Sequence, residues 1–294
     1  MFLSSLVKYR AAVLDTVIFY RLVLSSMEMN DPSLDDCVDW AHAQIQSRLG
    51  VSFPRPLLII GDEEIKARMQ CGSRRDVARV LPEMMYDDVS GAIIVPDSYL
   101  SSAGEINPSR RRYVLLHEIA HALTTHVNPI LNEERITSLL NSDLRRQRVG
   151  YSLYSFVEGI ADGIAVGVAH ASEDAALHAC ADEVHGARVD YFVRWLDAYF
   201  APYRKLRSSI DMCRRTGVLP LPQSVDMVAA SPSDPLSCAL SILDRCPGVV
   251  AANNAHYAVG YDFVRKVGVD PIALMRKPPT SFKELLYPET YAKW

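Results

Sequence analysis

Several features that would point to a specialised class of protein are scarce in this chain. The six cysteines among its 294 residues form no C-x-x-C pair and no compact cluster, which predicts small buried side chains rather than disulfides or a structural zinc site. Basic residues do not dominate: the formal net charge is −4, which argues against nucleic acid as the main partner. With 49% hydrophobic and 22% charged residues, the composition is that of an ordinary globular protein with an ample core.

Long hydrophobic runs are missing from the N-terminal region, residues 1–29. Charged residues at positions 8, 10, 15 and 21 interrupt its apolar stretches, so the region fits neither a signal peptide nor a membrane span. The spacing predicts an amphipathic helix that packs on the domain, with contact to a membrane surface as the alternative. We therefore expect a cytoplasmic protein without a transmembrane segment. A chain that begins downstream of an export signal is the alternative.

The most informative stretch runs from Tyr113 to Leu123 and contains the motif H-E-x-x-H. His117 and His121 are four residues apart, so on a helix both imidazoles lie on one face and can bind one cation. Zn²⁺ accepts neutral imidazole ligands, and Glu118, directly after the first histidine, can reach a water on the metal. A carboxylate there can accept the water's proton and pass it to a leaving amine. The motif therefore predicts a zinc site with Glu118 as general base.

The residues around this motif favour a buried helix. Asn107 and Pro108 are typical of an N-cap and a first helical residue. Apolar side chains then occupy most faces, at Tyr113, Val114, Leu115, Leu116, Ile119, Ala120, Ala122 and Leu123. A buried helix has little reason to hold two histidines and a glutamate unless a cation compensates them. The alternative is a core helix whose histidines bond to backbone carbonyls.

A zinc site needs a third protein ligand. A histidine ten residues after His117 would fit the metzincin pattern, but Val127 stands there. The better candidate is Glu158, in a second apolar segment that carries Asp162 four residues later on the same helical face. We predict that Glu158 binds the metal and that Asp162 accepts the N–H of a ligating histidine. Small residues between positions 159 and 167 would let this helix lie close against the motif helix.

The sequence His117-Glu-Ile-Ala-His121 followed by Glu158-Gly-Ile-Ala-Asp162 resembles the gluzincin clan of zinc metallopeptidases, the thermolysin-like group. The resemblance implies a zincin-like α+β fold, with a small upper-lobe sheet, the motif helix, the glutamate helix and a mostly helical C-terminal lobe. It also implies Zn²⁺ as cofactor and a peptide or protein as substrate. The 37 residues from His121 to Glu158 exceed the thermolysin-type interval, so residues 127–155 must loop out or form a helix of their own.

We expect one catalytic domain over residues 1–294. An N-terminal helix at about 1–29 would precede an upper lobe at about 51–126 and a lower helical lobe at about 127–294. The apolar and turn patterns predict helices at about 31–50, 63–71, 108–123, 132–149, 151–168, 172–200 and 256–267. They also predict a short buried strand at about 56–61 and a second strand at about 90–96.

The second strand has a predicted role in substrate binding. In gluzincin-like folds, the sheet edge just before the motif helix binds extended substrate by β-augmentation, and residues 91–95 are the candidate for that edge. The alternative is a fully buried strand, since continuous apolar runs usually indicate burial on both faces.

The C-terminal lobe is expected to contribute an oxyanion donor. In gluzincins, a histidine or tyrosine from this lobe donates to the oxyanion of the tetrahedral intermediate. The available donors are His256, Tyr257 and Tyr261, and Gly260 would let the backbone come close. We favour Tyr261 as the catalytic donor. The alternative is a tyrosine buried on the helix as an ordinary core aromatic.

The C-terminal residues carry a second resemblance. They are similar to the tail of bacterial H-E-x-x-H proteins of unassigned function, which ends in P-T-S-T-E-Q-hydrophobic-L-H-P-E-K-Y. The matching positions are Pro279, Thr280, Ser281, Leu286, Pro288, Glu289 and Tyr291, and the departures are Phe282, Lys283, Tyr287 and Thr290. Some small gluzincins hold their own C-terminal segment in the cleft, so Lys277–Trp294 is predicted to inhibit the site.

Together these observations predict a zinc metallopeptidase that hydrolyses peptide bonds with a metal-activated water. The first alternative is a latent or inactive zinc-binding, peptidase-like protein with a regulatory or binding role, because the motif indicates a metal site more directly than it indicates turnover. The second alternative is a non-peptidase hydrolase such as an amidase, because the same water activation serves both reactions.

Overall fold

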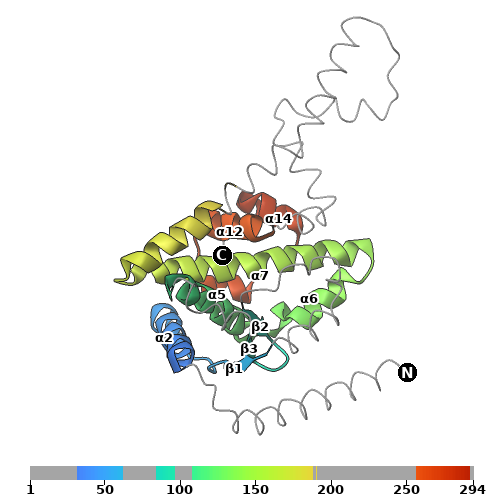
Figure 1. The fold of residues 1–294 in the computed structure, drawn as a ribbon. Coiled ribbons are helices and arrows are strands. Elements are labelled where there is room, and N and C mark those ends of the chain that lie inside the picture. Colours follow the sequence, from blue (N-terminus) through green and yellow to red (C-terminus); the bar gives the residue numbers. More distant parts are fainter. Residues whose placement is uncertain (1–31, 62–83, 97–107, 188–189, 191–255, 292–294) are drawn as a thin grey trace, which may run out of the picture. The chain divides into compact units, whose positions relative to one another are not determined.

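The computed structural model of the chain describes residues 32–61, 84–96, 108–187, 190 and 256–291. Within these ranges the protein is mostly helical with one small three-stranded sheet, so the predicted α+β class is confirmed at that level (Figure 1). The helices predicted at 1–29 and 63–71 lie outside the described residues. So do the aromatic residues at 191, 192, 195 and 199 and the cysteines at 71, 213, 238 and 246.

The chain divides into two compact units, residues 1–123 and 124–294. The boundary falls inside one continuous helix, α5, which runs from Pro108 to Val127. In its described part, the first unit contains the sheet, a helix before the sheet and most of α5, whereas the second unit is helical.

Helix α2 (Pro32–Leu49) agrees with the helix expected at about 31–50. It ends at Gly50, whose φ of 63° lies in the left-handed region that favours glycine after a helix. The N–H of Gly50 donates to the carbonyl of Gln46 at 2.9 Å and closes the last turn. Beyond the helix, Arg55 forms ion pairs with Asp35 and Asp39, which tie the connection to the sheet back onto α2.

The sheet consists of three short strands in the order β1-β3-β2, namely β1 (Leu57–Ile60), β2 (Met85–Asp87) and β3 (Ala92–Val95). β1 runs parallel to β3, and β2 runs antiparallel to it. A tight turn joins β2 to β3. In this turn the carboxylate of Asp87 accepts the N–H of Ser90 at 2.8 Å, and Gly91 adopts a φ of 66° that residues with a side chain rarely tolerate.

The position of β3 corrects one prediction about the substrate edge. β3 is the central strand, since β1 and β2 pair with its two sides, and all four of its side chains are buried. The prediction that residues 91–95 form an edge is therefore wrong, and the alternative of a buried strand is correct. The outer strand β1 departs from the expected burial as well: Leu57 is 42% exposed and the other three residues are half-buried.

The segment between His121 and Glu158 was predicted either to loop out or to form a helix of its own. The structure shows that it contains a helix of its own. Its elements are the 3₁₀ helix η1 (Pro129–Leu131), α6 (Glu133–Leu140) and the start of α7 (Leu144–Ala171). The single helix predicted at about 132–149 is wrong, because the chain breaks between α6 and α7. Asp143 accounts for the break: its carboxylate accepts the N–H groups of Arg145 and Arg146 at 3.0 and 3.1 Å and caps the new helix.

Helix α7 is 28 residues long and extends beyond the predicted 151–168 at both ends. Among the described residues it is the one helix long and apolar enough to cross a membrane, over Arg145–Ala171. However, 83% of its apolar window is buried inside the protein, and the core helix of a soluble protein passes the same test. The composition of α7 is therefore weak evidence for a membrane span.

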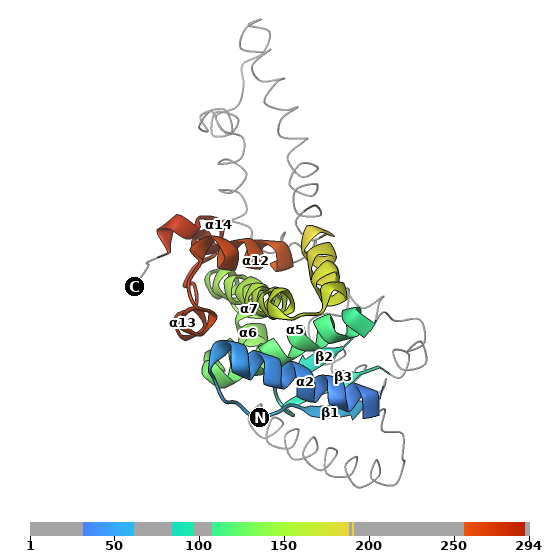
Figure 2. The same cartoon turned by 90° about the vertical axis from the view of Figure 1, so that its left-hand side faces the viewer.

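The remaining elements follow α7 in the second unit. A helix described over residues 175–187 begins at Asp174, whose carboxylate accepts the N–H groups of Ala176 and Leu177 at 3.0 Å. The C-terminal elements are α12 (His256–Val267), α13 (Pro271–Arg276), α14 (Phe282–Leu286) and the 3₁₀ helix η2 (Pro288–Thr290). The bounds of α12 are those predicted. α12 and α14 both pack on α7 (Figure 2).

Helices α7 and α12 approach each other through glycines. Gly159 of α7 faces Gly260 of α12, and Gly163 faces Val264 one turn further along both helices. Since the contacts advance together, the two helices run in the same direction. Gly159 and Gly163 were expected to face the motif helix, but they serve the packing of α12 instead.

Candidate metal centre

Helix α5 builds the first half of the candidate site. It begins at Pro108, as predicted, while the expected cap Asn107 lies outside the described residues. His117 and His121 stand one helical turn apart, with their Nε2 atoms 3.0 Å from each other. Their rings lie edge to face, 4.7 Å between centroids, with the two Nε2 atoms facing each other.

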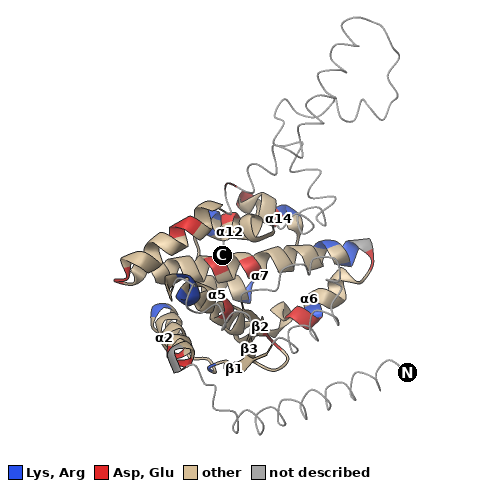
Figure 3. Cartoon of the chain, in the orientation of Figure 1, with Lys and Arg blue, Asp and Glu red and all other residues tan. Residues whose placement is uncertain are grey.

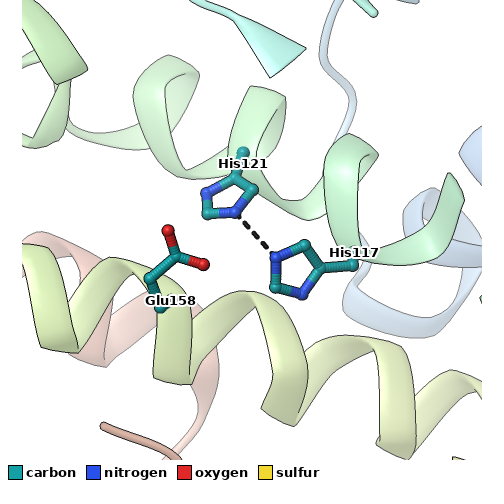
Figure 4. A group of neighbouring side chains, drawn as sticks. All are labelled: His117, His121 and Glu158. Atoms are coloured by element: carbon teal, nitrogen blue, oxygen red, sulfur yellow. Dashed lines mark hydrogen bonds between the residues drawn. The ribbon is translucent and has the colours of Figure 1, made fainter. Parts of the chain in front are cut away.

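Glu158 of α7 completes a group of three potential ligands. The ligand atoms of His117, His121 and Glu158 all lie within 4.8 Å of one another (Figure 4). No other group of three or more histidine, cysteine or acidic side chains within the described ranges meets this condition. His117 and Glu158 are each only 8% exposed. His121 is half-buried. The structure therefore contains a His/His/Glu group that could bind a metal ion, as the sequence predicted.

The spacing of the two histidine nitrogens suits a shared ion. Two nitrogens bound to one tetrahedral zinc at about 2.0–2.1 Å would lie about 3.3 Å apart, close to the 3.0 Å seen here. Two imidazoles and a carboxylate are ligands that zinc and other divalent transition metals accept. These residues therefore fit a divalent transition metal, and a water-accessible fourth position would distinguish a catalytic from a structural site.

Glu118 lies beside the histidines and is held by the sheet. Its side chain is 9% exposed, and its Oε2 atom accepts the backbone N–H of Tyr86 in β2 at 2.7 Å. A hydrogen bond to a charged oxygen at this length is of the strong kind. The predicted general base is therefore fixed to a strand that precedes it by 32 residues.

Charge is nearly absent from α7 beyond its first turns. After Arg148, the only Asp or Glu residues up to the helix end are Glu158 and Asp162, and there is no Lys or Arg (Figure 3). Asp162 is one turn beyond Glu158 and is 1% exposed. Burial of a carboxylate is costly unless hydrogen bonds or a cation compensate it, which makes both acids candidates for functional positions. The predicted bond from Asp162 to a ligating histidine stays a prediction.

His256, one of the predicted donors, lies on the side of α12 that meets α7. It is 3% exposed and stacks on Tyr154, with 4.6 Å between the ring centroids and 30° between the ring planes. Its ring centroid also lies 4.3 Å from that of Tyr257. Tyr154 and Glu158 share one face of α7 because they are four residues apart. The imidazole of His256 therefore packs against the residue one turn before the candidate ligand.

Tyr261 has a different neighbour. Its ring lies 4.4 Å from that of His185, in the helix over 175–187. Burial raises the pKa of Tyr261, with Arg265 acting in the opposite direction and Asp182 adding to the rise. Its phenol is therefore protonated, and able to donate, at neutral pH. The catalytic role predicted for Tyr261 stays a prediction.

The C-terminal tail is part of the second unit's fold. Ser281 caps α14 by accepting the N–H of Glu284, and the carboxylate of Glu284 accepts the N–H of Thr280 at 2.6 Å, in a variant of the capping box. The hydroxyl of Tyr291 donates to the carbonyl of Lys277. These matched tail positions thus have structural roles, and self-inhibition by the tail stays a prediction.

Two neighbours of the predicted residues were missed at the sequence level. Strand β2, which brings Tyr86 to Glu118, has only three residues and no long apolar run. The turn-forming sequence from Asp87 to Gly91, at the start of the predicted second strand, could have indicated a preceding strand. Tyr154 was overlooked as the ring against His256, because a stacked pair between two helices leaves no pattern along the chain.

Comparisons of the chain with protein-family models, with curated proteins and with solved structures find no match. The resemblance to gluzincins therefore rests on the two motifs and their arrangement.

Proposed function

We propose that this chain is a zinc-dependent metallopeptidase of the gluzincin type. The observation that carries this proposal is the group of His117, His121 and Glu158, whose ligand atoms lie within 4.8 Å of one another. The neighbouring Glu118 supplies the carboxylate that hydrolysis needs. A zincin-like arrangement of a small sheet, a motif helix and a glutamate helix is part of the same proposal, as is a cytoplasmic protein that acts on peptides or proteins.

The donor set of the site supports zinc as the metal. His117, His121 and Glu158 provide three protein ligands, which is the usual number for a catalytic zinc with one position open to water. When bound, Zn²⁺ lowers the pKa of a water and polarises a carbonyl oxygen. Asp162 would fix the orientation of a ligating histidine, because such histidines usually donate their second ring N–H to a carboxylate or carbonyl.

The remaining chemistry belongs to side chains of this protein. Glu118 accepts a proton from the attacking water and returns it to the leaving amine, which is the role of a general base followed by a general acid. A donor on α12 stabilises the negative charge that develops on the substrate carbonyl oxygen. The packing of His256 against Tyr154 supports His256 for this role, and Tyr261 is the second candidate.

Metal content is the experiment that tests the proposal. We expect purified wild-type protein to contain about one zinc per chain by mass spectrometry, and Glu158→Ala to lose it. Glu183→Ala, which removes an exposed carboxylate on the helix over 175–187, is the matched control and should keep the metal. A well-folded wild-type protein that binds no metal, even when zinc is supplied, would refute the proposal.

Turnover is tested separately, with a peptide library and Glu118→Gln. This variant should keep its zinc and lose about a hundredfold or more of the hydrolysis rate, because general-base catalysis is typically worth that much. An active Glu118→Gln protein would contradict the assigned role of Glu118. A zinc-bound wild type that cleaves no peptide would favour the latent binding protein, and cleavage of small amides alone would favour an amidase.

A further inference from the structure

The carboxylate of Glu118 is hydrogen-bonded to the main chain of the sheet. Its Oε2 atom accepts the N–H of Tyr86 at 2.7 Å, and the side chain is almost fully buried. A glutamate side chain has several rotatable bonds and loses a substantial entropy when it is held in one conformation. A short hydrogen bond to the charged oxygen provides the free energy that opposes this loss.

The register of β2 explains why this N–H is available. Tyr86 lies opposite Ile93, between the pairs Met85–Ile94 and Asp87–Ala92. Along an antiparallel strand, successive N–H groups point alternately toward the partner strand and away from it. Because the N–H of Tyr86 reaches Glu118, it points away from β3, and β2 is an outer strand of the described sheet. The bond to Glu118 therefore replaces no bond of the ladder.

We propose that the backbone N–H of Tyr86 positions Glu118 for catalysis by holding one of its carboxylate oxygens in a fixed place beside the two histidines. This inference rests on the proposed function for its catalytic part. Tyr86 acts through Glu118 and is a positioning residue. Its side chain is not needed for this role, since the donor belongs to the main chain.

A proline substitution distinguishes the effect of the main-chain N–H of Tyr86 from the effect of its side chain. Tyr86→Pro removes the N–H, and proline is tolerated on an outer strand where its N–H side faces away from the partner. Tyr86→Ala is the matched control, because it removes the ring and keeps the donor. We expect Tyr86→Pro to show a kcat about ten- to a hundredfold below that of Tyr86→Ala, with KM and zinc content unchanged. Equal kcat values in the two folded variants would overturn the proposal.

Amide hydrogen exchange tests the contact without any activity. In the metal-free wild type, the amide of Tyr86 should exchange slowly, because a hydrogen-bonded N–H is protected until the structure opens locally. In metal-free Glu118→Ala, that amide should exchange at least about tenfold faster, while the amides of Ile93 and Ile94 in β3 keep their rates. An unchanged rate for Tyr86 would show that Glu118 does not hold this N–H and would overturn the proposal.

The two measurements separate this inference from the proposed function. If wild-type protein hydrolyses no peptide, the peptidase assignment fails, and the exchange rate of Tyr86 still decides whether the amide fixes the carboxylate. If Tyr86→Pro does not fold, the comparison of wild type with Glu118→Ala decides the same point. Loss of activity in Tyr86→Pro together with loss of zinc would count against positioning, because it would indicate general damage to the site.

Discussion

Gly159 in α7 and Gly260 in α12 are in backbone contact. A Cβ atom on Gly260 would lie 3.0 Å from the Cα atom of Gly159 and would overlap the carbonyl group of Ser155. The obstacle is helix backbone, which cannot move aside as a flexible side chain can. The contact brings the start of α12, with His256, against the segment of α7 that leads to Glu158.

We therefore expect Gly260→Ala to be strongly destabilising. Overpacking of this kind costs about 1–3 kcal/mol in the free energy of unfolding, and the backbone obstacle places this variant at the upper end. Gly167→Ala is the control, because a Cβ there meets nothing within 4 Å on the same helix α7. The control should gain about 0.5–1 kcal/mol from its higher helix propensity. Urea titrations measure both, and equal stability of the two variants would contradict the close contact.

Asp162→Asn should weaken zinc binding without abolishing it. Loss of a carboxylate that orients a ligating histidine typically costs about 10- to 100-fold in metal affinity. The control is Asp182→Asn, which alters an exposed acid that bonds to His170 at 2.8 Å in the second unit. Competition with a zinc chelator measures the affinities. Identical zinc affinity in wild type and Asp162→Asn would assign Asp162 to the packing of α7 alone.

Two substitutions distinguish His256 from Tyr261 as the oxyanion donor on α12. His256→Phe keeps an aromatic ring against Tyr154 and removes the N–H, and Tyr261→Phe removes only the hydroxyl. Loss of an oxyanion donor typically lowers kcat about 10²- to 10³-fold. We expect this loss in His256→Phe, with zinc content and KM unchanged. A loss confined to Tyr261→Phe would instead support the donor favoured by the sequence.

Because of Tyr86, the free energy of unfolding is expected to fall as the pH rises above 10. Burial raises the pKa of its phenol to about 12, with Asp88 and Asp87 adding to the rise. Between pH 10 and 12, the folded protein thus keeps a proton that the unfolded chain has lost, so the stabilisation present below pH 10 is lost as the pH rises. Tyr86→Phe should decline less steeply in this range. Urea midpoints at several pH values measure the difference, and parallel curves would contradict the raised pKa.

Phe282→Ala tests what the C-terminal tail contributes. Phe282 is buried at the start of α14, and Phe→Ala substitutions in a core cost about 3–5 kcal/mol in the free energy of unfolding. Lys283→Ala, at the exposed position next to it, should be nearly neutral. Peptide hydrolysis per folded molecule decides the predicted self-inhibition: it rises in Phe282→Ala if the tail restrains the site, and stays constant if the tail is only structural.

The candidate metal-binding group could be predicted from the sequence because its signal is local. A spacing of four residues places His117 and His121 on one side of any helix, whatever that helix packs against. The same reasoning singled out Glu158 and Asp162, since two acids in an apolar helix are costly unless something compensates them. The ends of α2 and the start of α5 could also be predicted, because glycine and proline determine the backbone conformation at their own positions.

Contacts between distant segments were decided only by the folded chain. The order β1-β3-β2 turned the expected edge strand into the central one, and Tyr86 reached Glu118 across 32 residues. Gly159 packed on α12 although the sequence suggested the motif helix. Periodicity along a chain reports which side of an element is apolar, but not which partner covers it. That choice depends on packing and loop closure over the whole protein, and these leave no pattern in any short stretch of residues.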